Sequence, residues 1–269
     1  MKGMKINLLL AMLLLCFIAC GDRGRNQISL KSPRHGNIWV VAHRGSHLSI
    51  PENTLAAYQK AIEEGADFVE IDVRMTADDH LVSFHNSSVL IEPSGEHRKI
   101  ADMTLQQLQA LDIASRVNPR WKDERIPELE DILRLCQGRI GIYLDLKQAP
   151  VDSVVRLIQR WQMTGDVLWY ADNDELKRVS ELCPECLIMP DPGPEKNLAE
   201  VLQLFHPVVV ATTWKQFSAS FAEQCHRSGA KVIMDDENPD CWPQALAWGC
   251  DGIQTDHPAQ LIAMLRQRK

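Results

Sequence analysis

The chain has 269 residues, of which 45% are hydrophobic, and its formal net charge is −7 at pH 7. This length and apolar content suffice for one sizeable core, and no shift in composition marks a second domain. The acidic balance excludes the basic footprint of a nucleic-acid-binding protein.

The first twenty residues have the composition of a secretory signal. Two lysines precede an apolar run over residues 6–18, followed by a small residue and Cys20. The run is too short to span a membrane, which takes about 20 residues. The position of Cys20 resembles the cleavage site of a bacterial lipoprotein. We expect a signal peptide over 1–19, a flexible lipoprotein tether over 20–37 and the folded domain over 38–269. The protein would then be exported and anchored to the periplasmic or cell-surface face of a bacterial membrane, with plain secretion as the alternative.

Cysteines beyond this segment allow too many pairings for the sequence to fix one. Cys183 and Cys186 have the spacing of a redox motif, but they lie between a helix pattern and a strand pattern. We expect two loop residues or a local disulfide there, not a catalytic pair.

Short β-rich runs recur along the chain, and most are separated by amphipathic segments with the period of a helix. The candidate strands are Ile38–His43, Asp67–Arg74, Leu81–His85, Ile140–Lys147, Val167–Tyr170, Leu187–Met189, Val208–Thr212, Lys231–Met234 and Gly252–Thr255. Strands that alternate with helices favour a parallel sheet.

The second and third candidate strands cannot be parallel neighbours. Only residues 75–80 join them, whereas a parallel crossover needs a dozen or more residues. We expect an antiparallel hairpin that extends one barrel strand. Eight parallel strands then remain, which favours a distorted (β/α)₈ TIM barrel, with an open doubly wound sheet as the alternative. Residues 86–127 show no clear strand and one short helix over 105–111, so we expect a small insertion at the C-terminal mouth.

Ionisable residues share one face of several strands, because side chains alternate across a strand. They are His43 in the first strand, Glu70, Asp72 and Arg74 in the second, His85 in the return strand, and Asp145 and Lys147 with Tyr143 in the fourth. Their polar members lie toward the C-terminal strand ends, where barrel active sites occur. We expect these side chains to meet at the mouth.

Three of these residues, Glu70, Asp72 and Asp145, are carboxylates that cannot all be buried and charged without compensation. A hard divalent cation would compensate their negative charge. Because the ligand atoms are all oxygen, Mg²⁺ or Ca²⁺ is favoured over zinc. The alternative for a single pair is a salt bridge inside the barrel, such as Asp145 with Lys147 or Glu70 with Arg74.

The remaining polar residues suit phosphodiester cleavage. His43 and His85 carry the side chain that titrates nearest neutrality, at about 6.5 when unperturbed, so they can serve as an acid and a base. Arg44 and Lys147 offer positive charge to phosphate oxygens. Either histidine fits either role, and both direct water attack and attack by a substrate hydroxyl through a cyclic phosphate are compatible with this set.

At these residues the sequence resembles the glycerophosphodiester phosphodiesterase family. The stretch AHRGSHLSIPENTLAAYQKAIEEGADFVEIDVRMTADDHLVSFH contains the family's HRG, PENT, E-x-D and final histidine elements in order. GEHRKIADMTLQQLQALD, RIPELEDIL, LDLK and GCDGIQTDHP look like its later blocks. The likeness runs from about Val40 to Pro258.

The resemblance implies a distorted TIM barrel that hydrolyses glycerophosphodiesters to glycerol 3-phosphate and an alcohol. It assigns general acid/base roles to His43 and His85, cation ligation to Glu70, Asp72 and Asp145, and phosphate contacts to Arg44 and Lys147. Glu52 of PENT would orient Arg44 or approach the metal, and Asn53 would cap the following helix.

The chain also departs from the family pattern. Asp145 stands where glutamate is usual, Asn86 replaces an aspartate after His85, and SSVLIEPSG replaces an arginine-threonine block. Asp235 stands where an aromatic residue would contact the substrate. The alternatives are a phospholipase of the same fold acting on intact or lyso-lipids, and a non-catalytic lipoprotein that binds glycerophosphoryl groups.

Overall fold

The computed structural model describes residues 30–235 and 238–268. The expected signal peptide and Cys20 lie outside this part of the chain. No helix within the described residues has the length and apolar content needed to cross a membrane.

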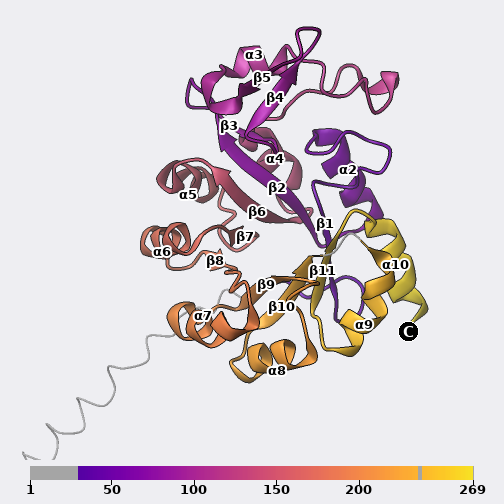
Figure 1. Cartoon of the computed structure of the whole chain (residues 1–269), viewed down its shortest axis with the longest axis vertical. Helices are drawn as coiled ribbons and strands as arrows, with labels where there is room; N and C mark the ends of the chain where they lie inside the picture. Colours follow the sequence, from indigo (N-terminus) through magenta and orange to yellow (C-terminus); the bar gives the residue numbers. More distant parts are fainter. Residues whose placement is uncertain (1–29, 236–237, 269) are drawn as a thin grey trace, which may run out of the picture.

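Eight parallel strands form the centre of the molecule, and helices surround them (Figure 1). In spatial order they are β8 (Leu187–Ile188), β7 (Val167–Tyr170), β6 (Gly141–Gln148), β2 (Phe68–Met75), β1 (Trp39–Ala42), β11 (Gly252–Thr255), β10 (Lys231–Asp235) and β9 (Val209–Thr213). This circular order is that of a barrel and not of an open doubly wound sheet. Strands β8 and β9 are the two ends of this path and do not pair with each other as strands. The Ala211 amide donates to the Pro190 carbonyl at 3.0 Å across the junction, so the barrel is nearly closed but distorted there.

The helices cover the outside of the barrel, where they bury the apolar face of each strand. They are α2 (Leu55–Glu64), α4 (Leu129–Cys136), α5 (Val151–Arg160), α6 (Asn173–Leu182), α7 (Leu198–Phe205), α8 (Ala219–Arg227), α9 (Trp242–Ala247) and α10 (Pro258–Gln267). Ile71 and Val73 of β2, and Ile142 and Leu144 of β6, belong to this outer core. The polar residues that alternate with them therefore face the barrel interior, as predicted.

The N-cap of α2 lies one residue later than predicted. Thr54 is the N-cap, and its hydroxyl accepts a hydrogen bond from the Ala57 amide at 3.2 Å. Gly65 ends the helix in the left-handed conformation, with φ 89°. The expectation that Asn53 caps the helix is wrong, because its buried side chain turns toward the barrel instead.

The predicted hairpin is confirmed. Strand β3 (Leu81–Ser83) pairs antiparallel with the end of β2, with Val73 opposite Ser83. The strand is shorter than expected, and His85 lies in the loop that follows it.

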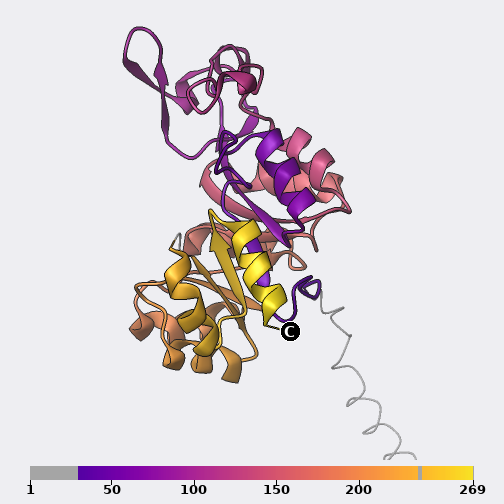
Figure 2. The same cartoon turned by 90° about the vertical axis from the view of Figure 1, so that its right-hand side faces the viewer.

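The insertion after β3 is more ordered than its sequence indicates. It contains α3 (Leu105–Gln109) and the strands β4 (Ser88–Ile91) and β5 (Glu96–Lys99), which form a separate antiparallel ladder. The expectation of no strand between 86 and 127 is therefore wrong. Every residue of β5 is exposed, so alternation of apolar and polar residues could not reveal it. Figure 1 and Figure 2 both show this insertion standing clear of the barrel helices.

Residues 30–37, the last part of the expected tether, contact the amino end of the barrel. The Trp39 indole donates to the Lys31 carbonyl, and the Arg34 amide donates to Asp67, each at 2.8 Å. Both contacts lie at the strand starts, opposite the predicted mouth. Elsewhere, Cys183 and Cys186 form the local disulfide anticipated from their loop position.

Candidate active site

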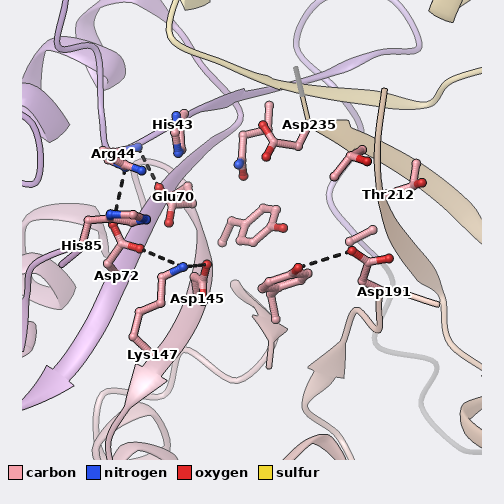
Figure 3. Close-up of a pocket in the computed structure, with 15 residues that line it drawn as sticks. His43, Arg44, Glu70, Asp72, His85, Asp145, Lys147, Asp191, Thr212 and Asp235 are labelled. Atoms are coloured by element: carbon pink, nitrogen blue, oxygen red, sulfur yellow. Dashed lines mark hydrogen bonds and ion pairs between the residues drawn. The ribbon is translucent and has the colours of Figure 1, made fainter. Parts of the chain in front are cut away.

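A pocket of about 260 Å³ lies at the carboxyl ends of the strands (Figure 3). Its lining residues are His43, Arg44, Glu70, Asp72, His85, Tyr143, Asp145, Lys147, Tyr170, Asp191, Ala211, Thr212, Thr213, Asp235 and Gln254. Of the site residues expected from the sequence, the pocket lining lacks Glu52, and of the strand residues expected at the mouth it lacks Arg74.

Register places the three carboxylates beside one another. Asp72 pairs with Asp145 across β2 and β6, and Glu70 lies two residues earlier on the same face. Each of the three offers an oxygen within 4.8 Å of the others. Burial, and then the neighbouring Asp72, raises the pKa of Glu70 well above its usual value, and burial also raises that of Asp145. Such a cluster is stable as anions only when positive charge lies against it.

The cluster has the donor set and an open ligand atom that a hard cation requires. Asp72 is 1% exposed, and its Oδ1 accepts no hydrogen bond from the described residues. Lys147 Nζ lies 3.4 Å from that oxygen and 2.6 Å from Asp145 Oδ2. The salt bridge considered from the sequence therefore exists, and it belongs to the same cluster.

A buried hydrogen-bond network holds Asp72 in place. The Asn53 amide donates to Asp72 Oδ2 at 2.8 Å. Its carbonyl oxygen accepts from the Tyr58 hydroxyl at 2.8 Å and from Ser83 Oγ at 2.9 Å. The sequence does not reveal this role of Asn53, because a helix cap explains an asparagine at that position equally well.

The HRG turn brings main-chain and side-chain donors to the cluster. Arg44 and Gly45 both have positive φ, at 52° and 84°. A Cβ on residue 45 would lie 2.7 Å from the carbonyl carbon of Ala57, so the turn requires glycine. This geometry directs the Arg44 amide to Glu70 Oε2 at 2.8 Å.

The Arg44 guanidinium is oriented by Glu52, one of the two roles expected for it. Arg44 donates to both Glu52 oxygens, at 3.0 and 3.1 Å, and its Nε lies 3.7 Å from Asp72. Burial opposes the charge of Arg44, but Glu52 and Asp72 outweigh it and raise its pKa. Glu52 belongs to neither the carboxylate cluster nor the pocket lining.

His43 pairs with a carboxylate that sequence analysis did not identify. Its Nδ1 lies 2.7 Å from Asp256 Oδ1, and since a carboxylate only accepts, Nδ1 carries the hydrogen. His47 Nε2 approaches the same oxygen at 3.3 Å. Burial opposes the charged form of His43, but the Asp256 hydrogen bond and the charges of Glu70 and Asp235 outweigh it and raise the pKa to about 9. Two signals mark Asp256 in the sequence: its place directly after the last strand and its position inside the family-like block GCDGIQTDHP.

His85 is positioned through its backbone. The Arg74 guanidinium donates to the His85 carbonyl at 2.6 Å and to the Phe84 carbonyl at 3.0 Å. His85 Nδ1 donates to Asn86 Oδ1 at 3.2 Å, so the residue that departs from the family pattern still contacts the imidazole. Arg74 thus holds the loop and does not line the pocket.

Comparisons with known proteins identify the family. The model of the Glycerophosphoryl diester phosphodiesterase family matches residues 43–260, more than half of the chain. The glycerophosphodiester phosphodiesterase of Caldanaerobacter subterraneus is 27% identical over 246 residues, which cover 85% of this chain and 98% of that protein. YhdW of Bacillus subtilis is 38% identical over 237 residues, covering 84% and 97%.

Solved structures share the fold. An Oleispira antarctica phosphodiesterase, solved in complex with the product sn-glycerol-3-phosphate, matches with a TM-score of 0.78 and 23% identity, covering 85% of this chain and 96% of that one. The glycerophosphodiester phosphodiesterase of Agrobacterium tumefaciens matches with a TM-score of 0.74 and 24% identity, covering 84% and 99%. From its motifs, its barrel and the family match, the chain belongs to the glycerophosphoryl diester phosphodiesterase family.

Proposed function

We propose that the protein hydrolyses glycerophosphodiesters to glycerol 3-phosphate and an alcohol, with a Mg²⁺ or Ca²⁺ ion held by Glu70, Asp72 and Asp145. The observation that carries this proposal is the convergence of their oxygens within 4.8 Å in a pocket that His43 and His85 also line. A bound divalent cation would neutralise the phosphate oxygens and so admit a nucleophile.

Other side chains of the pocket would bind the phosphate and transfer protons. Arg44 and Lys147 bind the phosphate oxygens that their positive charges face. One imidazole removes a proton from the attacking water, while the other donates a proton to the alcohol oxygen as its bond to phosphorus breaks. The Asp256 carboxylate stabilises the protonated form of His43, which favours His43 as the acid and leaves His85 as the base.

The lining favours a water-soluble diester over an intact lipid. Ala211 is the one aliphatic residue among the described residues of the pocket, and the others are charged, polar or aromatic. An acyl chain would find little apolar surface inside. The complete set of histidines and carboxylates argues against a purely binding role.

The test offers purified protein a panel of glycerophosphodiesters and lysolipids, with Mg²⁺, Ca²⁺ or a chelator, and measures released glycerol 3-phosphate. We expect cation-dependent release from the diesters and loss of at least a hundredfold in kcat for His85→Ala. His80→Ala is the matched control, because His80 lies in the same hairpin region and pairs with Glu128 outside the pocket. Turnover of lysolipids alone, or unchanged release in chelator, would contradict the proposal.

We also propose that the protein is an exported lipoprotein anchored through Cys20. The signal-like composition of residues 1–19 supports this. Mass spectrometry of the mature amino terminus in the membrane fraction should find acylated Cys20. An unmodified protein in the soluble fraction would contradict the anchor.

A further inference from the structure

The wall of the pocket opposite the catalytic groups carries two carboxylates together with hydroxyl and amide groups. We call this the acidic wall and define it by Tyr170, Asp191, Thr212, Asp235 and Gln254. Figure 3 shows Asp191, Thr212 and Asp235 across the pocket from His43, Arg44 and His85. None of these residues acts directly at phosphorus in the proposed function, and Asp235 enters it only through its contribution to the raised pKa of His43.

The Asp191 carboxylate has no cation paired with it among the described residues. Its Oδ1 accepts from the Gly193 amide at 2.7 Å, and its Oδ2 accepts a long hydrogen bond of 3.4 Å from the Tyr170 hydroxyl. Burial raises its pKa. The nearby cations Arg44 and Lys147 are paired with carboxylates on the catalytic side.

Two further side chains of the acidic wall lack partners. Thr212 is 2% exposed and Gln254 is 5% exposed, and both line the pocket. Thr212 Oγ1 and Gln254 Oε1 have no hydrogen-bond partner among the described residues. Buried polar atoms are nearly always satisfied. Gln254 Oε1 can only accept, so it indicates a ligand that brings a hydrogen-bond donor, and the Thr212 hydroxyl can accept a second one.

Two tyrosine rings also line the pocket at the acidic wall. Tyr143 and Tyr170 lie with ring centroids 5.7 Å apart, inclined by 47°. Asp235 lines the same pocket as both rings. Carboxylates beside aromatic faces provide favourable surroundings for an organic cation.

We infer that the acidic wall binds a primary ammonium group on the alcohol half of the diester, with Asp191 and Asp235 as the specificity-determining residues. A primary ammonium supplies both a positive charge to pair with Asp191 and N–H donors that Gln254 Oε1 and Thr212 Oγ1 can accept. A quaternary ammonium supplies only the charge, and a glycerol alcohol supplies only donors. The inference rests on the proposed phosphodiesterase function and specifies its substrate class.

Four substrates with the same glycerophosphate half separate these contributions. The 2-aminoethyl ester has charge and donors, the choline ester has charge alone, the glyceryl ester has donors alone, and the propyl ester has neither. We expect kcat/KM for the aminoethyl ester to exceed that for the propyl ester by roughly tenfold or more, with the other two between them. Asp191→Asn and Asp235→Asn should each bring this ratio toward one. Asp131→Asn, which removes an exposed carboxylate on α4, should leave the ratio unchanged.

The ionic strength dependence of the unmodified protein supplies a second measurement that needs no variant. KM for the aminoethyl ester should rise with salt more steeply than KM for the propyl ester, because the phosphate charge is common to both. Equal kcat/KM for these two esters, or equal values for the glyceryl and aminoethyl esters, would overturn the inference while leaving the phosphodiesterase function intact. Failure to cleave all four esters would overturn the function itself.

Discussion

Removing the negative charge of Asp256 should slow catalysis without disturbing the phosphate site. Asp256→Asn keeps the size of the side chain, and the amide oxygen can still accept from His43 Nδ1. The carboxylate that stabilises the protonated imidazole at 2.7 Å is lost. We therefore expect the change to act on proton donation to the leaving alcohol.

The geometry of the contact between His43 and Asp256 sets the size of the expected loss in kcat. The side chains of His43 and Asp256 are 12% and 22% exposed, so water screens the pair only in part. A hydrogen bond to a charged group is worth about 1.5–3 kcal/mol, and each 1.4 kcal/mol corresponds to a factor of about ten. We expect kcat for an alkyl diester to fall roughly 10- to 100-fold, with KM changed by less than about threefold.

The dependence of the rate on the leaving group separates a loss of proton donation from a general disruption of the active site. A p-nitrophenyl ester of glycerophosphate needs little protonation at its leaving oxygen, so Asp256→Asn should slow it by less than about threefold. Glu128→Gln alters a histidine–carboxylate contact of 2.8 Å outside the pocket and serves as the matched control. Equal losses for alkyl and nitrophenyl esters, or an unchanged kcat for both, would refute the assigned role of Asp256.

Three further changes test the network around the site. Asn53→Asp puts a second buried carboxylate against Asp72, 2.8 Å from the present amide, and should lower the free energy of unfolding in urea by about 3 kcal/mol or more; a loss under 1 would contradict the network. Gly45→Ala should cost at least about 1 kcal/mol in the same assay, because its Cβ would lie 2.7 Å from Ala57. The pKa of His43 is raised to about 9 from 6.5, so in chelator its stabilisation is complete below pH 6.5 and disappears as pH rises through 9. The melting temperature should fall over that interval in the parent and less in His43→Gln; parallel profiles would refute this.

The barrel and the carboxylate cluster could both be predicted from the sequence, and for the same reason. Strand alternation put Glu70 and Asp72 opposite Ile71 and Val73, and the short connection after β2 required a hairpin. Strand alternation and the minimum length of a parallel crossover both follow from local backbone geometry, so they hold whatever the tertiary contacts are. Parallel register then brought Asp145 beside Asp72.

Residues whose role depends on tertiary contacts were not predicted. Asp256 is separated from His43 by 213 positions, and no periodic pattern links the two. Asn53 has positive φ and turns its amide inward, so the neighbouring Thr54 became the cap. The strand β5 is exposed on both faces and offers no alternation to detect.

Cation binding is the measurement that tests the central claim most directly. Titration of metal-free protein with Mg²⁺ or Ca²⁺ in a calorimeter should show one site per chain. Asp72→Asn should abolish that site, because it removes a buried oxygen that accepts no hydrogen bond from the described residues. Asp131→Asn, which changes neither the cluster nor the pocket lining, should bind as the parent does. Binding that is absent from the parent, or retained at full affinity in Asp72→Asn, would contradict a cation held by Glu70, Asp72 and Asp145.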